Sequence, residues 1–166
     1  LESELFGHVK GAFPDAVSDR PGLVQQAHLG TLFLEEVGEL PSDLQDKLLR
    51  VIDQGVVTRV GSQQIEYVDV RIVGSTSYDL AAAVDRGSFL RELYTRLNVV
   101  DFDVPALRDR PEDVIVLAEA FLRRHGGRRE LGEIDDEAAW VMENYTWPGN
   151  VRELENCIER ACTLAS

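Results

Sequence analysis

Short apolar runs followed by helical patterns dominate the first part of the chain. Residues 31–34 are apolar over a stretch too short for a helix and lead into acidic residues, which is typical of a buried parallel strand with chemistry at its carboxyl end. Apolar residues at helical spacing over residues 41–53 predict a helix with Ser42 as its cap. The Gly61-Ser62 pair between β-favouring segments indicates a hairpin-like insertion that leads into a second core strand over residues 68–73.

The next part of the chain continues the alternation. Residues 79–86 and 89–98 are predicted to be helical. Apolar and acidic residues then alternate over residues 99–104, which predicts a third strand. Strands that alternate with helices indicate an α/β layer.

After Pro105 the pattern becomes entirely helical. Amphipathic helices are predicted at residues 112–124, 135–145 and 150–164. The stretch from Gly126 to Gly132 is the best candidate for a flexible connector. We therefore predict an α/β domain at residues 1–105 and a helical subdomain at residues 106–166.

Composition narrows the classes of protein that fit this pattern. The 166 residues are enough for one domain with its own core, and no apolar run approaches the roughly 18 residues that span a bilayer. Nothing marks the chain for secretion, so we expect a cytoplasmic protein without membrane contact. A net charge of −13 repels a phosphate backbone, so direct DNA binding by this segment is not expected. The three histidines and two cysteines show no metal-ligand spacing.

Glu35 and Glu36 are the first candidates for chemistry. The predicted strand at 31–34 delivers both carboxylates to the sheet edge at which ligands of open α/β folds bind. One could hold the water shell of Mg²⁺ while the other polarises an attacking water. A pair of solvated surface acids is the alternative interpretation.

Several longer strings occur in one order along the chain and together carry a specific resemblance. They are ELFGHVKGAF, GTLFLEEVGELP, LLRVIDQGVVTRVGS, VDVRIVGSTSYDL, ELYTRLNVV, LRDRPEDV and WPGNVRELEN. The set closely resembles the central domain of sigma-54-dependent transcriptional activators, also called bacterial enhancer-binding proteins. This resemblance implies a partial AAA+ P-loop NTPase-type three-layer α/β/α core followed by a small all-helical lid, and it implies ATP and Mg²⁺ as cofactors.

The resemblance also assigns roles to the acidic pair and to one loop. It places Glu35 at the Mg²⁺-binding position of the Walker B pair, through water, where the family normally has Asp, and Glu36 at the water-activating position. The family's sigma-contact loop reads GAFTGA, and the matching residues here are Gly11, Ala12, Phe13, Pro14, Asp15 and Ala16. Phe13 is the expected contact, with simple core packing as the alternative. Pro14 removes a hydroxyl and a backbone donor and fixes φ near about −65°, and Asp15 lacks the conformational freedom of glycine.

Further family positions fall elsewhere in the chain. Ser77 matches the sensor I asparagine, and the two arginines that the family presents to a neighbouring subunit's nucleotide fall on Leu90 and Arg96. For Arg96 considered on its own, a surface ion pair is the simpler interpretation. The segment around Val60-Gly61-Ser62 is similar to a second insertion that moves with the contact loop, with a plain hairpin turn as the alternative.

The sensor II segment of the lid is matched by WPGNVRELEN. Asn150 is predicted to cap the following helix, which places Arg152 in its first turn and, by resemblance, facing bound nucleotide. An ion pair of Arg152 with Glu153 or Glu155 is the alternative.

No string in the chain has the glycine-rich form of a P-loop that ends in Lys and Ser or Thr. We therefore expect ATP and Mg²⁺ binding only if a Walker A segment is supplied. Our hypothesis is that the chain is a piece of a longer protein or a degenerate relative of the family. The resemblance places the absent strand between the one that ends near Ser75 and the one at residues 99–104.

Three functions follow in order of preference. The first is an ATP-driven remodelling module that contacts sigma-54 RNA polymerase holoenzyme and self-associates in a ring. The second is a catalytically degenerate interaction or regulatory module without ATP turnover, which the changes at Pro14, Asp15, Ser77 and Leu90 favour. The third, a DNA-binding regulator, is disfavoured by the acidic composition.

Overall fold

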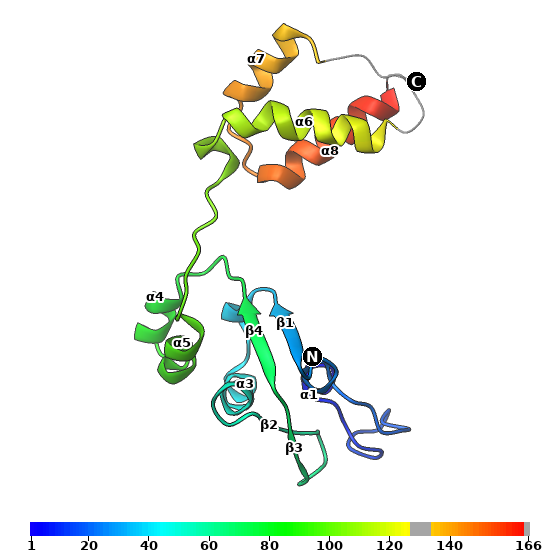
Figure 1. Cartoon of the computed structure of the whole chain (residues 1–166), viewed down its shortest axis with the longest axis vertical. Helices are drawn as coiled ribbons and strands as arrows, with labels where there is room; N and C mark the ends of the chain where they lie inside the picture. The colour runs from blue at the N-terminus through cyan, green and yellow to red at the C-terminus, as the bar shows by residue number, and fades with distance from the viewer. Residues whose placement is uncertain (127–133, 165–166) are drawn as a thin grey trace. The chain divides into compact units, whose positions relative to one another are not determined.

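The computed structural model describes residues 1–126 and 134–164 (Figure 1). The chain divides into two compact units, Leu1–Asp101 and Phe102–Ser166. Each unit has its own cluster of buried apolar side chains. The predicted α/β class with a following helical part is confirmed.

The sheet of the first unit pairs two strands that are distant in sequence. Strand β1 (Gly30–Leu34) runs parallel to β4 (Val70–Gly74), as Figure 1 shows. Leu32 lies opposite Ile72, and Phe33 lies opposite Val73. Because side chains alternate along a strand, Leu32 and Ile72 share one face of the sheet and Phe33 and Val73 share the other.

Only one of these faces meets the helices of the described chain. The helices are α1 (Glu2–Phe6), α2 (Leu23–Gln26), α3 (Ser42–Gln54), α4 (Leu80–Asp85) and α5 (Arg91–Leu97). Leu32 is buried in one core with side chains from all of them, including the fully buried Leu48 of α3 and Leu93 of α5. On the other face Phe33 is 54% exposed and Val73 is 38% exposed. Of the three layers predicted, the described residues supply two, the sheet and one helical layer.

The predicted helix at residues 41–53 is confirmed with a small shift at its start. Helix α3 begins at Ser42, so the prediction of Ser42 as its cap was wrong: Pro41 occupies that place, without a side-chain cap. The helix ends at Gly55, which has a left-handed conformation with φ of 63°. The predicted hairpin follows, as β2 (Val56–Thr58) pairs antiparallel with β3 (Ile65–Tyr67).

The predicted strand at residues 99–104 does not form. These residues have no regular secondary structure, and Val99, Val100, Phe102 and Val104 are 67–83% exposed. A strand persists only where its backbone groups pair with a neighbour, and in the described chain β4 pairs with β1 alone. The alternating pattern was therefore present without the pairing that it requires.

The second unit is helical, as predicted. Its elements are η2 (Leu107–Asp109), α6 (Glu112–His125), α7 (Asp136–Asn144) and α8 (Asn150–Leu164). Leu107, Val114 and Leu154 are at most 1% exposed at the centre of its core. Trp147 closes the core from the turn before α8 and donates from Nε1 to the carbonyl of Met142 at 2.8 Å. The predicted connector, apart from Gly126, lies outside the described residues.

None of the helices described by the structure combines the length and the apolar character needed to cross a membrane.

Candidate functional site

The carboxyl ends of β1 and β4 form a shared edge that continues beyond the strands. The amide of Ser75 donates to the carbonyl of Leu34 at 2.9 Å, and the amide of Val37 donates to the carbonyl of Ser75 at 3.0 Å. This backbone pairing carries the two chain segments side by side past the sheet. It places the acidic pair of one segment next to the Ser77 region of the other.

Glu36 and Ser77 are in direct contact at this edge. The Glu36 Oε2 atom accepts a hydrogen bond from the Ser77 amide at 2.9 Å and another from the Ser77 hydroxyl at 3.0 Å. The backbone of Glu36 is left-handed, with φ of 51°, a conformation that is uncommon outside glycine and that often marks functional positions. The structure therefore brings together two of the residues that the sequence singled out.

Glu35 is placed differently from Glu36. Its side chain is exposed and borders a hollow of about 490 Å³ that Glu4, Leu5 and Phe33 also line. Among the described residues its carboxylate has no hydrogen-bond or ion-pair partner. An uncommitted carboxylate fits Mg²⁺, which proteins hold with one or two carboxylates while water and phosphate supply the other ligands. No cluster of three His, Cys, Asp or Glu side chains that could hold a metal occurs among the residues described.

A second carboxylate contact at this edge was not predicted from the sequence. The Tyr78 hydroxyl donates to Glu39 Oε1 at 3.1 Å. The pKa of Tyr78 is raised, first by this hydrogen bond and then by the negative charge of Glu39, with smaller effects of burial and of Glu36. Tyr78 also lines a hollow of about 300 Å³, with Thr76, Asp79 and Asn98 among the polar groups at its wall. The only sequence feature that could have indicated this contact is that both Tyr78 and Glu39 follow the end of a strand.

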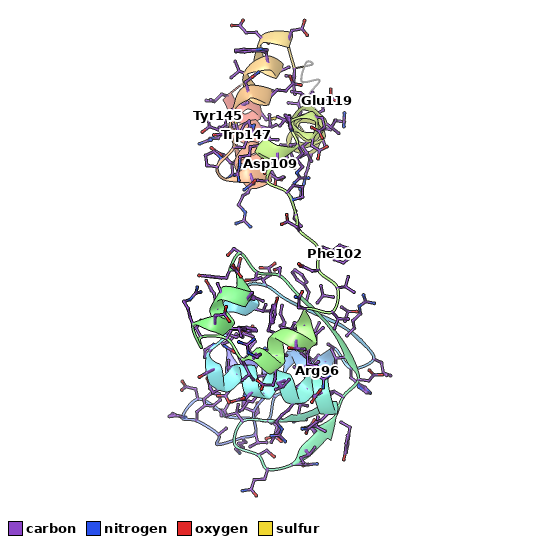
Figure 2. The ribbon with its side chains drawn as sticks, turned by 90° about the vertical axis from the view of Figure 1, so that its left-hand side faces the viewer. Arg96, Phe102, Asp109, Glu119, Tyr145 and Trp147 are labelled. Atoms are coloured by element: carbon purple, nitrogen blue, oxygen red, sulfur yellow. The ribbon has the colours of Figure 1, made fainter. Side chains whose placement is uncertain are left out.

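Arg96 forms the ion pair that was the alternative to a catalytic role. Arg96, which is labelled in Figure 2, lies in the last turn of α5, and its Nη2 atom lies 2.6 Å from Asp53 Oδ1. Its side chain is 56% exposed, so the guanidinium is accessible from solvent. Leu90 precedes this helix at its N-cap and packs against the core.

Gln45 is a buried polar residue that sequence reasoning missed. Its side chain is 2% exposed; Nε2 donates to the carbonyls of Leu40 and Ser88, and Oε1 accepts from the Leu90 amide at 2.7 Å. These bonds fix the start of α5 against α3 and so determine where Arg96 lies. A single Gln in an amphipathic helix gives no sign of this, because its partners are distant in sequence.

The predicted contact loop, residues 11–16, emerges from a paired stem. His8 and Arg20 exchange two backbone hydrogen bonds of 2.9 Å, and the Lys10 amide donates to Asp19 Oδ1 at 2.7 Å. The Gly11 amide then donates to the carbonyl of Ala16 at 2.8 Å and closes the loop.

This loop contacts the predicted second insertion around Val60-Gly61-Ser62. The Val9 amide donates to the Val60 carbonyl at 3.1 Å, and the Val60 amide donates to the Gly7 carbonyl at 2.9 Å. Gly61 has φ of 78°, and a Cβ atom there would lie 2.7 Å from the Cβ of Ala12. The two loops are therefore in van der Waals contact, and only glycine permits this approach.

Phe13 lies on the surface of the contact loop with one side supported. Its side chain is 37% exposed, and its ring centroid lies 4.9 Å from that of His8. His8 is itself 9% exposed, and its Nδ1 is 2.7 Å from the Ser3 hydroxyl. Core packing, the alternative for Phe13, does not describe this arrangement. This supporting role of His8 was not predicted from the sequence, because the histidines were considered there only as possible metal ligands.

In the second unit, Arg152 is exposed in the first turn of α8. The predicted alternative, an ion pair with Glu153 or Glu155, does not form. Glu153 Oε2 accepts from the Gly149 amide at 2.8 Å, and Glu155 pairs with Arg124 and His125 at 3.1 Å each. Within the described part of the chain the guanidinium of Arg152 has no partner.

The prediction for Asn150 was wrong in detail. Its side-chain oxygen accepts a hydrogen bond from the Leu107 amide at 2.9 Å and so joins the start of α8 to η2. The Glu153 carboxylate bonds the backbone at the helix start instead. Trp147 in the preceding turn and Asn150 at the helix start both have left-handed backbone conformations, with φ of 45° and 52°.

A parallel α/β unit with acidic groups at its carboxyl edge, accompanied by a separate helical unit, is the arrangement expected of an AAA+ domain with its lid. Residues 1–103 match the family model of the Sigma-54 interaction domain, and residues 108–166 match that of the AAA+ ATPase lid domain. The chain belongs to the sigma-54 interaction domain family.

Relatives and solved structures agree with this assignment. The chain is 51% identical over 166 residues to the response regulator protein PilR of Pseudomonas aeruginosa, covering 99% of this chain and 37% of PilR. It is 46% identical over 168 residues to the regulatory protein AtoC of Escherichia coli, covering 100% of this chain and 36% of AtoC. A crystal structure of NtrX from Brucella abortus matches with a TM-score of 0.89 and 36% identity, over 99% of this chain and 37% of that one. The chain thus spans little more than a third of the length of these proteins.

Proposed function

We propose that this chain is the ATP-dependent remodelling module of a sigma-54-dependent transcriptional regulator and that it contacts sigma-54 RNA polymerase holoenzyme. The observation that carries the proposal is the Glu36–Ser77 contact at the carboxyl edge of the parallel sheet, where open α/β folds bind ligands. A structure of NtrX from Brucella abortus in complex with ATP, 36% identical with a TM-score of 0.88, supports the choice of nucleotide.

The proposed roles follow from where the side chains lie. Glu36 would accept a proton from the attacking water, since its Oε1 atom makes no hydrogen bond among the described residues. Glu35 would hold the Mg²⁺ of the nucleotide through water, and Ser77 and Arg152 would bind the nucleotide. The metal supplies charge stabilisation on the phosphates when bound.

Arg96 would act in a neighbouring copy of a ring, where its charge stabilises the transferred phosphoryl group. For this it must leave Asp53, a change that an exposed ion pair permits because such pairs contribute at most about 1 kcal/mol. We further propose that the contact loop meets the sigma factor through Phe13, and that the segment does not bind DNA, given its net charge of −13. A cytoplasmic location is part of the same proposal.

The second candidate is an interaction module of the same family without ATP turnover. The specific observation in its favour is that Arg96 is already paired with Asp53 while Leu90, at the other arginine position, is packed against the core. This candidate keeps sigma-factor binding and predicts no hydrolysis.

A chimera tests both candidates. The 166 residues replace the matching segment of Pseudomonas aeruginosa PilR, and ATP hydrolysis is measured with and without Glu36→Gln. We expect hydrolysis by the chimera and a loss of at least about 100-fold in kcat on Glu36→Gln, the lower range for removal of a general base.

The matched control is Glu39→Gln, a carboxylate at the same edge that bonds Tyr78, which should leave kcat within about twofold. Hydrolysis that survives Glu36→Gln would contradict the proposed role of the sheet edge. A chimera that binds purified sigma-54 but hydrolyses no ATP would favour the second candidate.

A further inference from the structure

The tip of the contact loop is a closed β-turn. The Ala16 amide donates to the carbonyl of Phe13 at 2.9 Å, which is the hydrogen bond of a four-residue turn. Neither Pro14 nor Asp15 has a positive φ, so the turn is of type I. Type I turns favour proline at the second position, because its ring fixes the φ that the turn needs, and they accept an acidic residue at the third.

Both ends of this turn are fixed to the body of the unit. The carbonyl of Ala16 accepts from the Gly11 amide at 2.8 Å, and the Ala16 side chain is only 4% exposed. Ala12 is seated against Gly61 of the second insertion. A turn that is anchored on both sides cannot move as a free loop without breaking these contacts.

Phe13, the first residue of the turn, is thereby held with its ring against the buried His8, and its outer side is left accessible. A side chain that is already oriented loses less conformational entropy when a partner covers it. Proline reduces the freedom of the open loop, and replacing Asp15 by glycine would increase it without relieving any strain, since φ is not positive.

We propose that Pro14 and Asp15 are positioning residues that keep the contact loop in one preformed turn, so that Phe13 is presented to the sigma factor before binding. This inference rests on the proposed function, because it takes Phe13 as the contact. It adds how the contact is prepared: the loop is already ordered in the free protein, so binding of the sigma factor does not require an ordering step. The family motif, with Thr and Gly at these two positions, lacks both restraints.

The experiment compares the chain with the double variant Pro14→Ala/Asp15→Gly. Amide hydrogen exchange by NMR on the free chain reports the turn, and titration against purified sigma-54 reports binding. We expect the Gly11 and Ala16 amides to be protected in the chain and to exchange about 4- to 30-fold faster in the variant, with sigma-54 binding weakened by a similar factor. The single variant Asp15→Asn removes the charge but keeps the turn preference, so its affinity should stay within about twofold.

A variant with Phe13→Ala separates positioning from general stability. In that background the double substitution should have no further effect on sigma-54 binding, while it should lower the thermal stability by the same amount with and without the Phe13→Ala change. Unprotected amides in the unaltered chain, or binding that is unchanged in the double variant, would overturn the inference alone. A large loss of sigma-54 affinity on Asp15→Asn would also overturn the inference, because the charge of Asp15 would then matter more than its effect on the turn. Sigma-54 binding that is absent from every form would overturn the proposed function and the inference with it.

Discussion

The contact loop and the sheet edge of the first unit are stabilised in different ways. The loop at residues 11–16 is closed by backbone hydrogen bonds at its stem, at its neck between Gly11 and Ala16, and at its tip, and it packs on a second loop. At the sheet edge, Glu36 is held by one residue, Ser77, and Glu35 by none that the structure describes. The surface proposed to meet a protein is therefore built into the fold, whereas the groups proposed to meet a nucleotide are left available to it.

The largest effect is expected at the base of the contact loop. Gly22, two residues beyond the stem residue Arg20, lies so close to the end of α1 that a Cβ atom would be 2.2 Å from the amide nitrogen of Gly7 and 2.5 Å from the carbonyl oxygen of Leu5. Because backbone atoms cannot give way as a flexible side chain does, Gly22→Ala should lower the free energy of unfolding by about 3 kcal/mol. Urea denaturation at constant m-value measures this.

Gly11→Ala is the control for that substitution. Gly11 has φ of 82° but no atoms that a Cβ would meet within 4 Å, so only the strained conformation contributes and the cost should be about 1 kcal/mol. If Gly22→Ala and Gly11→Ala lowered the free energy of unfolding equally, the base of the loop would be no more tightly packed than its neck. The contrast between a firmly built loop and a loosely held sheet edge would then not be supported.

Local pattern was enough to predict most of the elements. Helical spacing located α3, α6, α7 and α8, and the apolar run before Glu35 located β1, because both signals lie within one element. Residues 99–104 show the limit of this reasoning. Alternating apolar and polar residues indicate that a segment can form a strand. Whether it does so depends on a neighbouring strand with which it can pair, and the sequence of the segment does not show whether that neighbour is there.

The same limit applies to the candidate sites. Glu35, Glu36, Ser77 and the loop were identified as family positions, and the structure adds the Glu36–Ser77 bond. The support of Phe13 by His8 and the anchoring of α5 by Gln45 were missed. Gln45 bonds backbone groups of residues that are distant in sequence, and His8 lies beneath the loop that carries Phe13. Neither contact produces a periodic pattern in the sequence.

A smaller effect is expected at the sheet edge itself. Ser77→Ala removes the hydroxyl that donates to Glu36 and leaves the Ser77 amide bond in place. Since the contact is exposed and half of it remains, the loss in free energy of unfolding should be about 0.5 kcal/mol. Ser75→Ala, two positions earlier and without a side-chain hydrogen bond in the described chain, is the matched control and should cost less. A Ser77→Ala cost as large as that of Gly22→Ala would mean that the edge is as firmly built as the loop.

The smallest effect concerns protonation at the edge. The pKa of Tyr78 is raised chiefly by its hydrogen bond to Glu39, so an ultraviolet titration compared with Tyr78→Phe should place its ionisation above the usual value of about 10. Glu39→Gln removes the largest causes and should move the pKa of Tyr78 back toward that value, whereas Glu35→Gln, which is not among the causes, should not. Because the folded-state pKa is raised, the contact stabilises the fold fully below the unfolded-state pKa of about 10, and the contribution is lost as pH rises through the folded-state value. If the Glu39→Gln titration coincided with that of the unaltered protein, the phenol would not be bonded to Glu39. The sheet edge would then have one fixed side-chain contact fewer, and its difference from the contact loop would be larger still.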